Sequence, residues 1–242
     1  MSISTQVRRS AATGTAQAAA QLEALSVVFP TAAGDLVALR DVDLTVEPAT
    51  SVALTGRSGS GKTTLLSVLG LVRRPTAGVV RIDGHRTCGL ARTEIASLRS
   101  TRVGHVFQSF HLEGSLTAVQ NVMLPWYFKH GRTARRAAKE RGLAVLEMVG
   151  ALGLADHRPS DMAEVDRQRV AVARALVLDP ALVLADEPTT SMDRDASDAV
   201  AGLLLSVPRL TGASVVLVTA RDCVSAAADR TVRLDAGRLS AG

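Results

Sequence analysis

Apolar and polar residues alternate along two segments near the N-terminus, with the period of a half-buried β-strand. These segments are 22–29 and 37–46, and a turn region at 30–35 separates them. Two later runs, 51–55 and 182–185, are almost wholly apolar, as expected for strands buried on both faces. Further strands are predicted at 79–83, 103–107, 214–219 and 231–234.

Helical patterns lie between these strands. We predict helices at 62–72, 119–128, 133–149, 164–178 and 195–206. In the third of them, Leu143 and Leu146 share one face with Met148 or Val149. No strand pattern occurs in the middle of the chain, so residues 109–178 are expected to form a helical subdomain. The alternation of strands and helices elsewhere predicts an α/β fold.

The first 20 residues are rich in Ala, Thr, Ser and Gln and show no periodic apolar pattern. We expect a flexible tail over 1–20 and one domain over 21–242. No run approaches the roughly 20 apolar residues of a membrane-spanning helix. Arg8 and Arg9 are not followed by an apolar stretch, so no secretory signal is expected. Cys88 and Cys223 lack metal-type spacing, which favours free thiols in a reducing cytosol.

The chain carries a net charge of +5, and its only lysines are Lys62, Lys129 and Lys139. An arginine bias of this kind is typical of a GC-rich genome. Attraction to an anionic inner membrane surface is a second interpretation. Nucleic-acid binding is less favoured, because aromatic residues make up only 2% and do not alternate with the basic ones.

A complete phosphate-loop motif, G-x-x-x-x-G-K-T, follows the predicted strand 51–55 and precedes a predicted helix. Its residues are Gly56, Arg57, Ser58, Gly59, Ser60, Gly61, Lys62 and Thr63. Glycines let the backbone approach phosphate oxygens, and the helix N-terminus favours an anion. Lys62 is expected to reach the β- and γ-phosphates of ATP, and Thr63 to bind Mg²⁺.

Two acidic residues, Asp186 and Glu187, follow directly after the apolar run 182–185. A buried strand that ends here would place Asp186 at the carboxyl edge of the sheet, where it could hold Mg²⁺ through water. Glu187 could polarise the attacking water. With the phosphate loop, this pair predicts a Mg-ATP site.

The ordered set of motifs resembles the nucleotide-binding subunits of ABC transporters over about residues 22–242. Within that family the chain is most similar to the lipoprotein-releasing and macrolide-export ATPases. The resemblance rests on Leu39–Val42, the phosphate loop, Val103–Phe110, Leu116–Val122, Gln168–Leu176, Asp186–Thr189 and Ser191–Asp193. It implies a P-loop NTPase core of ABC type with an antiparallel β subdomain and a helical subdomain.

Several roles follow from the resemblance alone. Gln108 should contact Mg²⁺ and the γ-phosphate and link the core to the helical subdomain. Phe29 lies where the family places an aromatic residue that stacks on adenine, although a core strand residue is the alternative. Thr64 is expected to add a nucleotide contact beside the phosphate loop. The resemblance also implies a transmembrane permease partner, which would face Gln108–Leu112, a second nucleotide-binding subunit, and a place on the cytoplasmic face of the inner membrane.

The chain departs from the family at the signature, which is usually Leu-Ser-Gly-Gly-Gln. The matching positions here are Met162, Ala163, Glu164, Val165 and Asp166. Ala163 lacks the serine hydroxyl, and Glu164 places an anion where the partner subunit's γ-phosphate should dock. Acidic residues at a helix N-terminus stabilise that helix, so we expect an intact helix that has lost its phosphate contact.

A second departure removes the switch histidine, because the family's Val-Thr-His-Asp is replaced by Val218-Thr219-Ala220-Arg221-Asp222. Ala220 cannot bond to the γ-phosphate, and Arg221 could compensate only if its side chain turned toward the nucleotide. Smaller departures are Ala49 and Thr50 in place of Gly-Glu, and Thr190 where Gly is usual.

Three functions remain open from the sequence. The chain could be an energising ATPase subunit of an exporter or of a machine that extracts lipids or lipoproteins. It could instead be a degenerate ATP-binding subunit with a structural or regulatory role and little hydrolysis. A soluble ABC protein of repair or translation is less favoured, because the length leaves no room for a second nucleotide domain.

Overall fold

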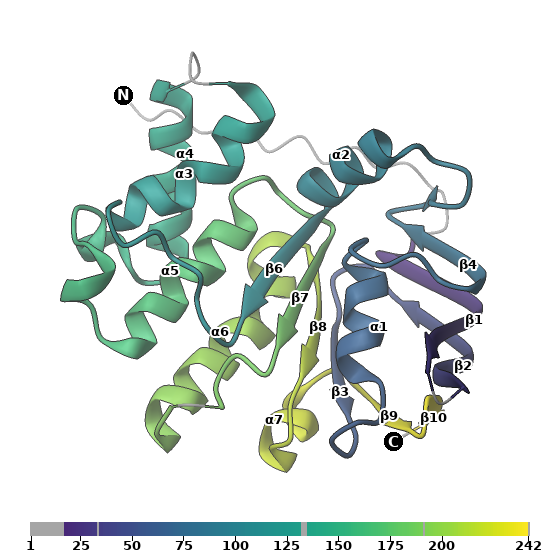
Figure 1. The fold of residues 1–242 in the computed structure, drawn as a ribbon. Coiled ribbons are helices and arrows are strands. Elements are labelled where there is room, and N and C mark those ends of the chain that lie inside the picture. The colour runs from purple at the N-terminus through teal and green to yellow at the C-terminus, as the bar shows by residue number, and fades with distance from the viewer. Residues whose placement is uncertain (1–16, 33, 132–134, 191, 242) are drawn as a thin grey trace.

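A computed structural model describes residues 17–32, 34–131, 135–190 and 192–241. Two sheets and a group of helices make up this part of the chain (Figure 1). The order of elements confirms the predicted α/β class, with an antiparallel sheet, a mostly parallel sheet and a group of helices packed beside it.

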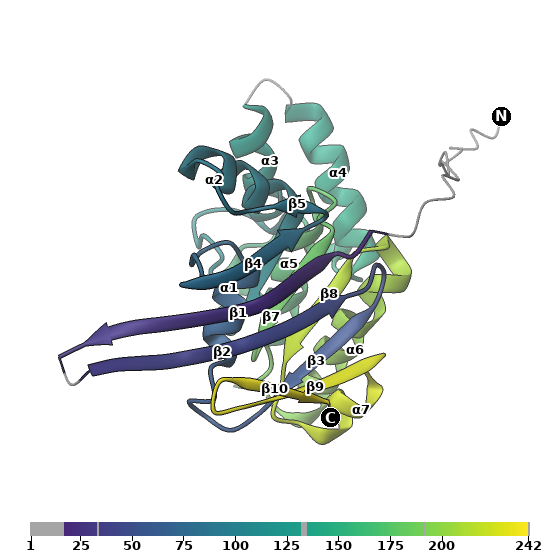
Figure 2. The same ribbon diagram turned by 90° about the vertical axis from the view of Figure 1, so that its right-hand side faces the viewer.

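The antiparallel sheet has the strand order β2-β1-β4-β5. Its strands are β1 (Ala20–Thr31), β2 (Gly34–Val46), β4 (Ala77–Ile82) and β5 (His85–Arg86). β1 and β2 form a long hairpin in which Phe29 pairs with Leu36 (Figure 2). This hairpin is longer than the predicted strands, because pairing continues to Thr31 and Gly34 across the region expected to turn.

The second sheet has the order β10-β9-β3-β8-β7-β6. Its strands are β3 (Ser51–Thr55), β6 (Val103–Phe107), β7 (Leu182–Asp186), β8 (Ser214–Val218), β9 (Arg230–Asp235) and β10 (Arg238–Ala241). All neighbours are parallel except β9 and β10. Asp186 therefore lies level with Phe107 on one side and with Val218 on the other, at the carboxyl edge of the sheet.

Some helices pack against the parallel sheet, and others lie beyond it on one side (Figure 1). They are α1 (Lys62–Leu69), α2 (Arg92–Arg102), α3 (Ala118–His130), α4 (Arg135–Met148), α5 (Glu164–Leu176), α6 (Arg194–Thr211) and α7 (Asp222–Ala227). One buried cluster joins α3, α4, α5 and α6 to β7 and β8, and a second joins the antiparallel sheet to α1 and β3. None of the helices in the described residues is long and apolar enough to cross a membrane.

Several boundaries differ from the sequence prediction. α1 ends at Leu69 instead of 72, because Gly70 caps it and Leu71 takes a left-handed φ of 55°. α6 continues to Thr211 despite Pro208, and Gly212 in the left-handed region ends it. The short elements α2, α7, β5 and β10 were not predicted.

Most of the segment predicted as a flexible tail, 1–16, lies outside the described residues. Its last residues are already structured, since Ala19 and Ala20 are buried and the Ala19 N–H donates to the Val46 carbonyl at 2.9 Å. The apolar pattern was recognised only from Leu22, because two alanines are a weak hydrophobic signal. The domain boundary at 20/21 stays a prediction.

Candidate nucleotide site

The phosphate-loop segment connects β3 to α1 at the carboxyl edge of the parallel sheet. Gly56, Gly59 and Gly61 have φ values of 145°, 75° and 107°, which side-chain-bearing residues rarely adopt. A Cβ at Gly56 would lie 2.2 Å from the Leu234 carbonyl oxygen, and one at Gly61 would lie 2.6 Å from the Ala38 carbonyl oxygen. The loop therefore needs glycines, because of these φ values and because it passes so close to β2 and β9 that a side chain would clash.

Lys62 is the first residue of α1, and its ammonium group lies across the phosphate loop. Nζ donates to the carbonyls of Gly56 and Arg57, at 2.8 Å each. Its positive charge also interacts electrostatically with Asp186 at the end of β7. Burial and the neighbouring Glu187 charge raise the pKa of Asp186, whereas the Lys62 charge lowers it. The structure therefore brings together a cation and a pair of carboxylates that are more than 120 residues apart in the sequence.

This arrangement fits a polyphosphate with a divalent cation. Ser60 is buried at 5% exposure, and its hydroxyl has no hydrogen-bond partner, so a polar group inside the loop is left for a ligand. Thr63 is exposed in the first turn of α1. The described residues contain no cluster of three or more His, Cys, Asp or Glu that could hold a metal. A Mg²⁺ ion here would need phosphate oxygens and water in addition to Thr63 and Asp186, which is how Mg²⁺ is usually bound beside nucleotides.

Phe29 lies near the end of β1 and is partly buried against the core of the antiparallel sheet. It also lines an open cavity of about 590 Å³. The cavity's other lining residues are Thr63, Thr64, Ser67, Val72, Arg73 and Arg74. The Arg73 guanidinium lies 4.2 Å from the centre of the Phe29 ring. Phe29 and Thr64 thus line the same cavity as Thr63 of the phosphate loop, and stacking of Phe29 on adenine stays a prediction.

Gln108 follows β6 directly and is exposed. The loop after it is held by α5, because Arg174 donates to the carbonyls of Phe110 and His111, the first at 2.7 Å. Burial lowers the pKa of Arg174. Gln168, also on α5, donates to the Phe107 carbonyl at 3.1 Å and to the Pro188 carbonyl at 3.0 Å. α5 therefore contacts the backbone beside both Gln108 and Glu187.

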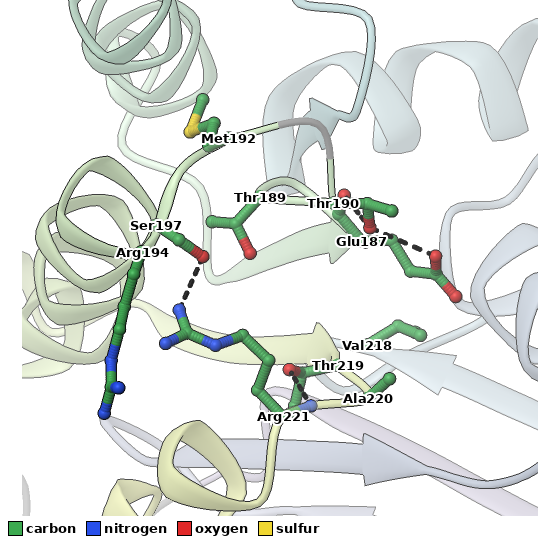
Figure 3. Close-up of a pocket in the computed structure, with 10 residues that line it drawn as sticks. All are labelled: Glu187, Thr189, Thr190, Met192, Arg194, Ser197, Val218, Thr219, Ala220 and Arg221. Carbon is green, nitrogen blue, oxygen red and sulfur yellow. Dashed lines mark hydrogen bonds between the residues drawn. The ribbon is translucent and has the colours of Figure 1, made fainter.

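Glu187 is half-buried and has a left-handed φ of 44°. It lines a cavity of about 430 Å³ together with Thr190, Ala220 and Arg221 (Figure 3). Val218 and Ala220, at and just after the end of β8, line the same cavity, and Glu187 directly follows the end of β7. The Thr190 hydroxyl lies 3.2 Å from Glu187 Oε2, in position to donate a hydrogen bond.

Arg221 points away from Glu187 in the same cavity (Figure 3). Its guanidinium donates to the Ser197 hydroxyl at 2.5 Å and to the Asp198 carboxylate at 2.6 Å, both on α6. The side chain that could have replaced the switch histidine is therefore bound to α6, and the methyl group of Ala220 offers no hydrogen bond at that position.

The segment that matches the signature leads into α5. Ala163 is the N-cap and makes no side-chain capping bond, and Glu164 and Asp166 lie in the first turn. Asp166 forms an ion pair with Arg169 at 3.2 Å. The helix begins where the sequence predicted, with two carboxylates at the positive end of its dipole.

Sequence reasoning did not single out Arg174 or a structural role for Gln168, and it recorded Thr190 only as a departure from glycine. Gln168 lies on an otherwise apolar face of the predicted helix 164–178, and a polar residue there could have indicated a structural role. In the structure it is fully buried. The partners of Gln168 lie 61 and 20 positions away, and those of Arg174 lie 63 and 64 positions away, so spacing could not reveal them.

A family model described as "ABC transporter" matches residues 39–190. The lipoprotein-releasing system ATP-binding protein LolD of Chromohalobacter salexigens is 38% identical over 218 residues, covering 90% of this chain and 91% of that protein. LolD of Geobacter metallireducens is 41% identical over 206 residues, with 84% and 89% covered.

A similar match occurs to the macrolide export ATP-binding/permease protein MacB of Syntrophobacter fumaroxidans. It is 39% identical over 203 residues, which cover 84% of this chain and 28% of MacB. Among solved structures, the dimeric post-hydrolysis state of the ATP-binding cassette MJ0796 bound to ADP and Pi has a TM-score of 0.80 and 32% identity. That match covers 92% of this chain and 98% of the other.

Proposed function

The chain belongs to the ABC transporter family, and we propose that it is a subunit that couples Mg-ATP binding and slow hydrolysis to a membrane permease. The observation that carries the proposal is the meeting of the phosphate loop, Lys62 and Asp186 at one edge of the parallel sheet. Bound Mg²⁺ would neutralise phosphate charge and orient the reacting oxygens.

The chain's own residues supply the rest of the chemistry in this proposal. Loop amides from Gly56 to Thr63 and the Lys62 ammonium bind the phosphates, with Arg57, Ser58, Gly59 and Thr64 beside them. Thr63, Asp186 and Gln108 would hold Mg²⁺, with water between the Asp186 carboxylate and the ion. Glu187 accepts a proton from the attacking water, and Phe29 stacks on the base.

Titration calorimetry with Mg-ATP tests the binding part. Lys62→Ala removes a charged donor, so the dissociation constant should rise roughly 10- to 150-fold. Lys139→Ala, on the exposed face of α4, is the matched control and should bind like the wild type. A wild-type chain with no affinity for ATP would overturn the proposal.

The permease partner is proposed from the surface next to Gln108. A cavity of about 500 Å³ there is lined by apolar and basic residues that include Phe107, Leu124, Phe128 and Arg174. Phe128 is 87% exposed, which is unusual for a large apolar side chain. We propose that a cytoplasmic segment of the permease docks here, beside Gln108–Leu112, and that a second ATP-binding subunit completes the machine.

The resemblance to LolD and MacB leads us to propose export, or extraction of lipids or lipoproteins, as the work of this complex. The chain would then sit at the cytoplasmic face of the inner membrane through its permease. Pull-down from native membranes should recover a membrane protein and a second ATPase chain. Retention on membranes after a high-salt wash, in cells that lack any partner permease, would contradict this mode of attachment.

A second candidate function is a degenerate ATP-binding subunit with a regulatory or structural role. Ala220 provides no polar contact, Arg221 is bound to Ser197 and Asp198, and Glu164 stands at the start of α5. These residues favour binding over turnover. Hydrolysis by the purified complex distinguishes the two candidates, because a regulatory subunit would leave the rate unchanged when its own Glu187 is replaced by Gln.

A further inference from the structure

A hydroxyl stands beside the proposed catalytic carboxylate at a position where the resembled family usually has glycine. Thr190 Oγ1 lies 3.2 Å from Glu187 Oε2 and 3.2 Å from the Glu187 carbonyl oxygen. Its backbone N–H also donates to that carbonyl, at 3.4 Å. Residues 187–190 therefore form a closed turn whose last side chain reaches back to the first (Figure 3).

The turn starts from an unfavourable conformation. Glu187 has a φ of 44°, in the left-handed region that residues with a side chain rarely adopt. The Thr190 N–H and the Thr190 hydroxyl both donate back to Glu187, and the single hydroxyl proton is shared between the carbonyl oxygen and Oε2. A glycine at this position could supply only the backbone contact, so the contact to the carboxylate depends on the threonine hydroxyl.

In the described part of the chain, neither of the two residues at the switch-histidine position is hydrogen-bonded to the Glu187 carboxylate. Arg221 is bound to Ser197 and Asp198, and Ala220 has no polar side chain. The carboxylate is thus oriented from its own turn and not from the end of β8.

We propose that Thr190 is a positioning residue for Glu187. Its hydroxyl holds Oε2 and thereby keeps the carboxylate over the ends of β7 and β8, where the attacking water is expected. The role of this contact in hydrolysis rests on the proposed function. The contact itself is present in the protein without nucleotide.

A spectroscopic measurement tests the contact without nucleotide. The carboxyl ¹³C resonance of Glu187 can be identified by its loss in Glu187→Gln. Thr190→Val removes the hydroxyl while keeping the shape, so the resonance should move. Thr190→Ser keeps the hydroxyl and should leave the resonance near its wild-type position. Thr93→Val makes the same chemical change on the exposed face of α2 and should leave it unmoved.

Single-turnover hydrolysis, with the protein in excess over Mg-ATP and well above the dissociation constant, tests the positioning role. Loss of one hydrogen bond predicts a rate lower by roughly 3- to 10-fold in Thr190→Val, with the dissociation constant changed less than about twofold. Thr190→Ser should retain most of the wild-type rate. This split separates positioning from a general loss of structure, which would weaken binding as well.

Each failure has a distinct meaning. An unmoved resonance in Thr190→Val overturns the contact. A moved resonance with a hydrolysis rate equal to the wild type, including the case in which neither protein hydrolyses ATP, overturns the positioning role. Absence of Mg-ATP binding by the wild type would overturn the proposed function while leaving the resonance as a valid test of the contact.

Discussion

The side-chain amide of Gln168 donates a hydrogen bond of 3.0 Å to the backbone carbonyl of Pro188, the residue that follows Glu187. The same amide donates to the Phe107 carbonyl at 3.1 Å, one residue before Gln108. Gln168 is fully buried on α5. One side chain of α5 therefore connects the backbone next to Glu187 with the backbone next to Gln108. These are the residues proposed to act on the attacking water and on the γ-phosphate.

Replacing Gln168 by Met should destabilise the protein, although the two side chains are similar in size. One buried and one partly buried carbonyl would lose their donor, so the free energy of unfolding should fall by roughly 1–3 kcal/mol. Chemical denaturation measures it. Gln21→Met, at a half-buried position of β1, is the matched control and should change stability by less than about 0.5 kcal/mol. Equal effects of the two substitutions would show that the bridge contributes nothing.

Restoring the switch histidine alone should help hydrolysis little. A lost hydrogen bond to a charged group corresponds to roughly 10- to 150-fold in rate, but the altered signature still opposes closure of the dimer. Ala220→His combined with Ala163→Ser, Glu164→Gly and Val165→Gly should therefore exceed the product of the separate gains. Steady-state ATP hydrolysis measures this.

The control for that series is Ala226→His, which adds the same side chain at an exposed position of α7. A wild-type chain that hydrolyses ATP as fast as the repaired variant would contradict the prediction. It would mean that another group has taken over the role of the missing histidine.

Gly61→Ala should damage the phosphate loop. The added Cβ would meet the Ala38 carbonyl oxygen at 2.6 Å, and φ at this position is 107°. We expect the free energy of unfolding to fall by roughly 1–3 kcal/mol and Mg-ATP binding to weaken. Gly114→Ala introduces the same methyl group with no atom within 4 Å and should leave both quantities close to wild type. Tight nucleotide binding by Gly61→Ala would contradict the assigned loop path.

Acid should remove a contribution to stability that Asp229 makes at neutral pH. Two hydrogen bonds from Ser51, its hydroxyl at 2.6 Å and its N–H at 2.8 Å, hold the pKa of the Asp229 carboxyl below the ordinary 3.8. A lowered folded-state pKa means that the contribution is complete above the ordinary value and is lost as the pH falls through the lowered one.

Asp229→Asn should therefore be less stable than the wild type at pH 7, and the difference should shrink below about pH 4. Urea denaturation across that range measures it. Asp235→Asn, an exposed carboxylate on β9, should show no such pH-dependent difference. A constant difference between Asp229→Asn and wild type at all pH values would indicate packing and not charge.

Features that lie within one continuous segment of the chain could be predicted from the sequence. The phosphate loop could be recognised because its glycines, Lys62 and Thr63 act within one strand–loop–helix unit. The strands predicted at 51–55 and 103–107 coincide with β3 and β6, since β-branched and aromatic residues between polar or glycine residues are a local signal. By contrast, α2 has Leu98 as its only buried residue, so its pattern was too weak to predict a helix.

Contacts between distant segments were decided only by the tertiary structure. Spacing cannot show that Gln168 reaches Pro188, that Arg174 holds the loop after Gln108, or that Arg221 turns to α6. These side chains bond to backbone carbonyls or to polar groups whose positions depend on how the parallel strands are ordered. Whether Arg221 could replace a histidine was open in the sequence, and packing of α6 against β8 determines its direction, because the hydroxyl of Ser197 and the carboxylate of Asp198 lie within reach of its guanidinium.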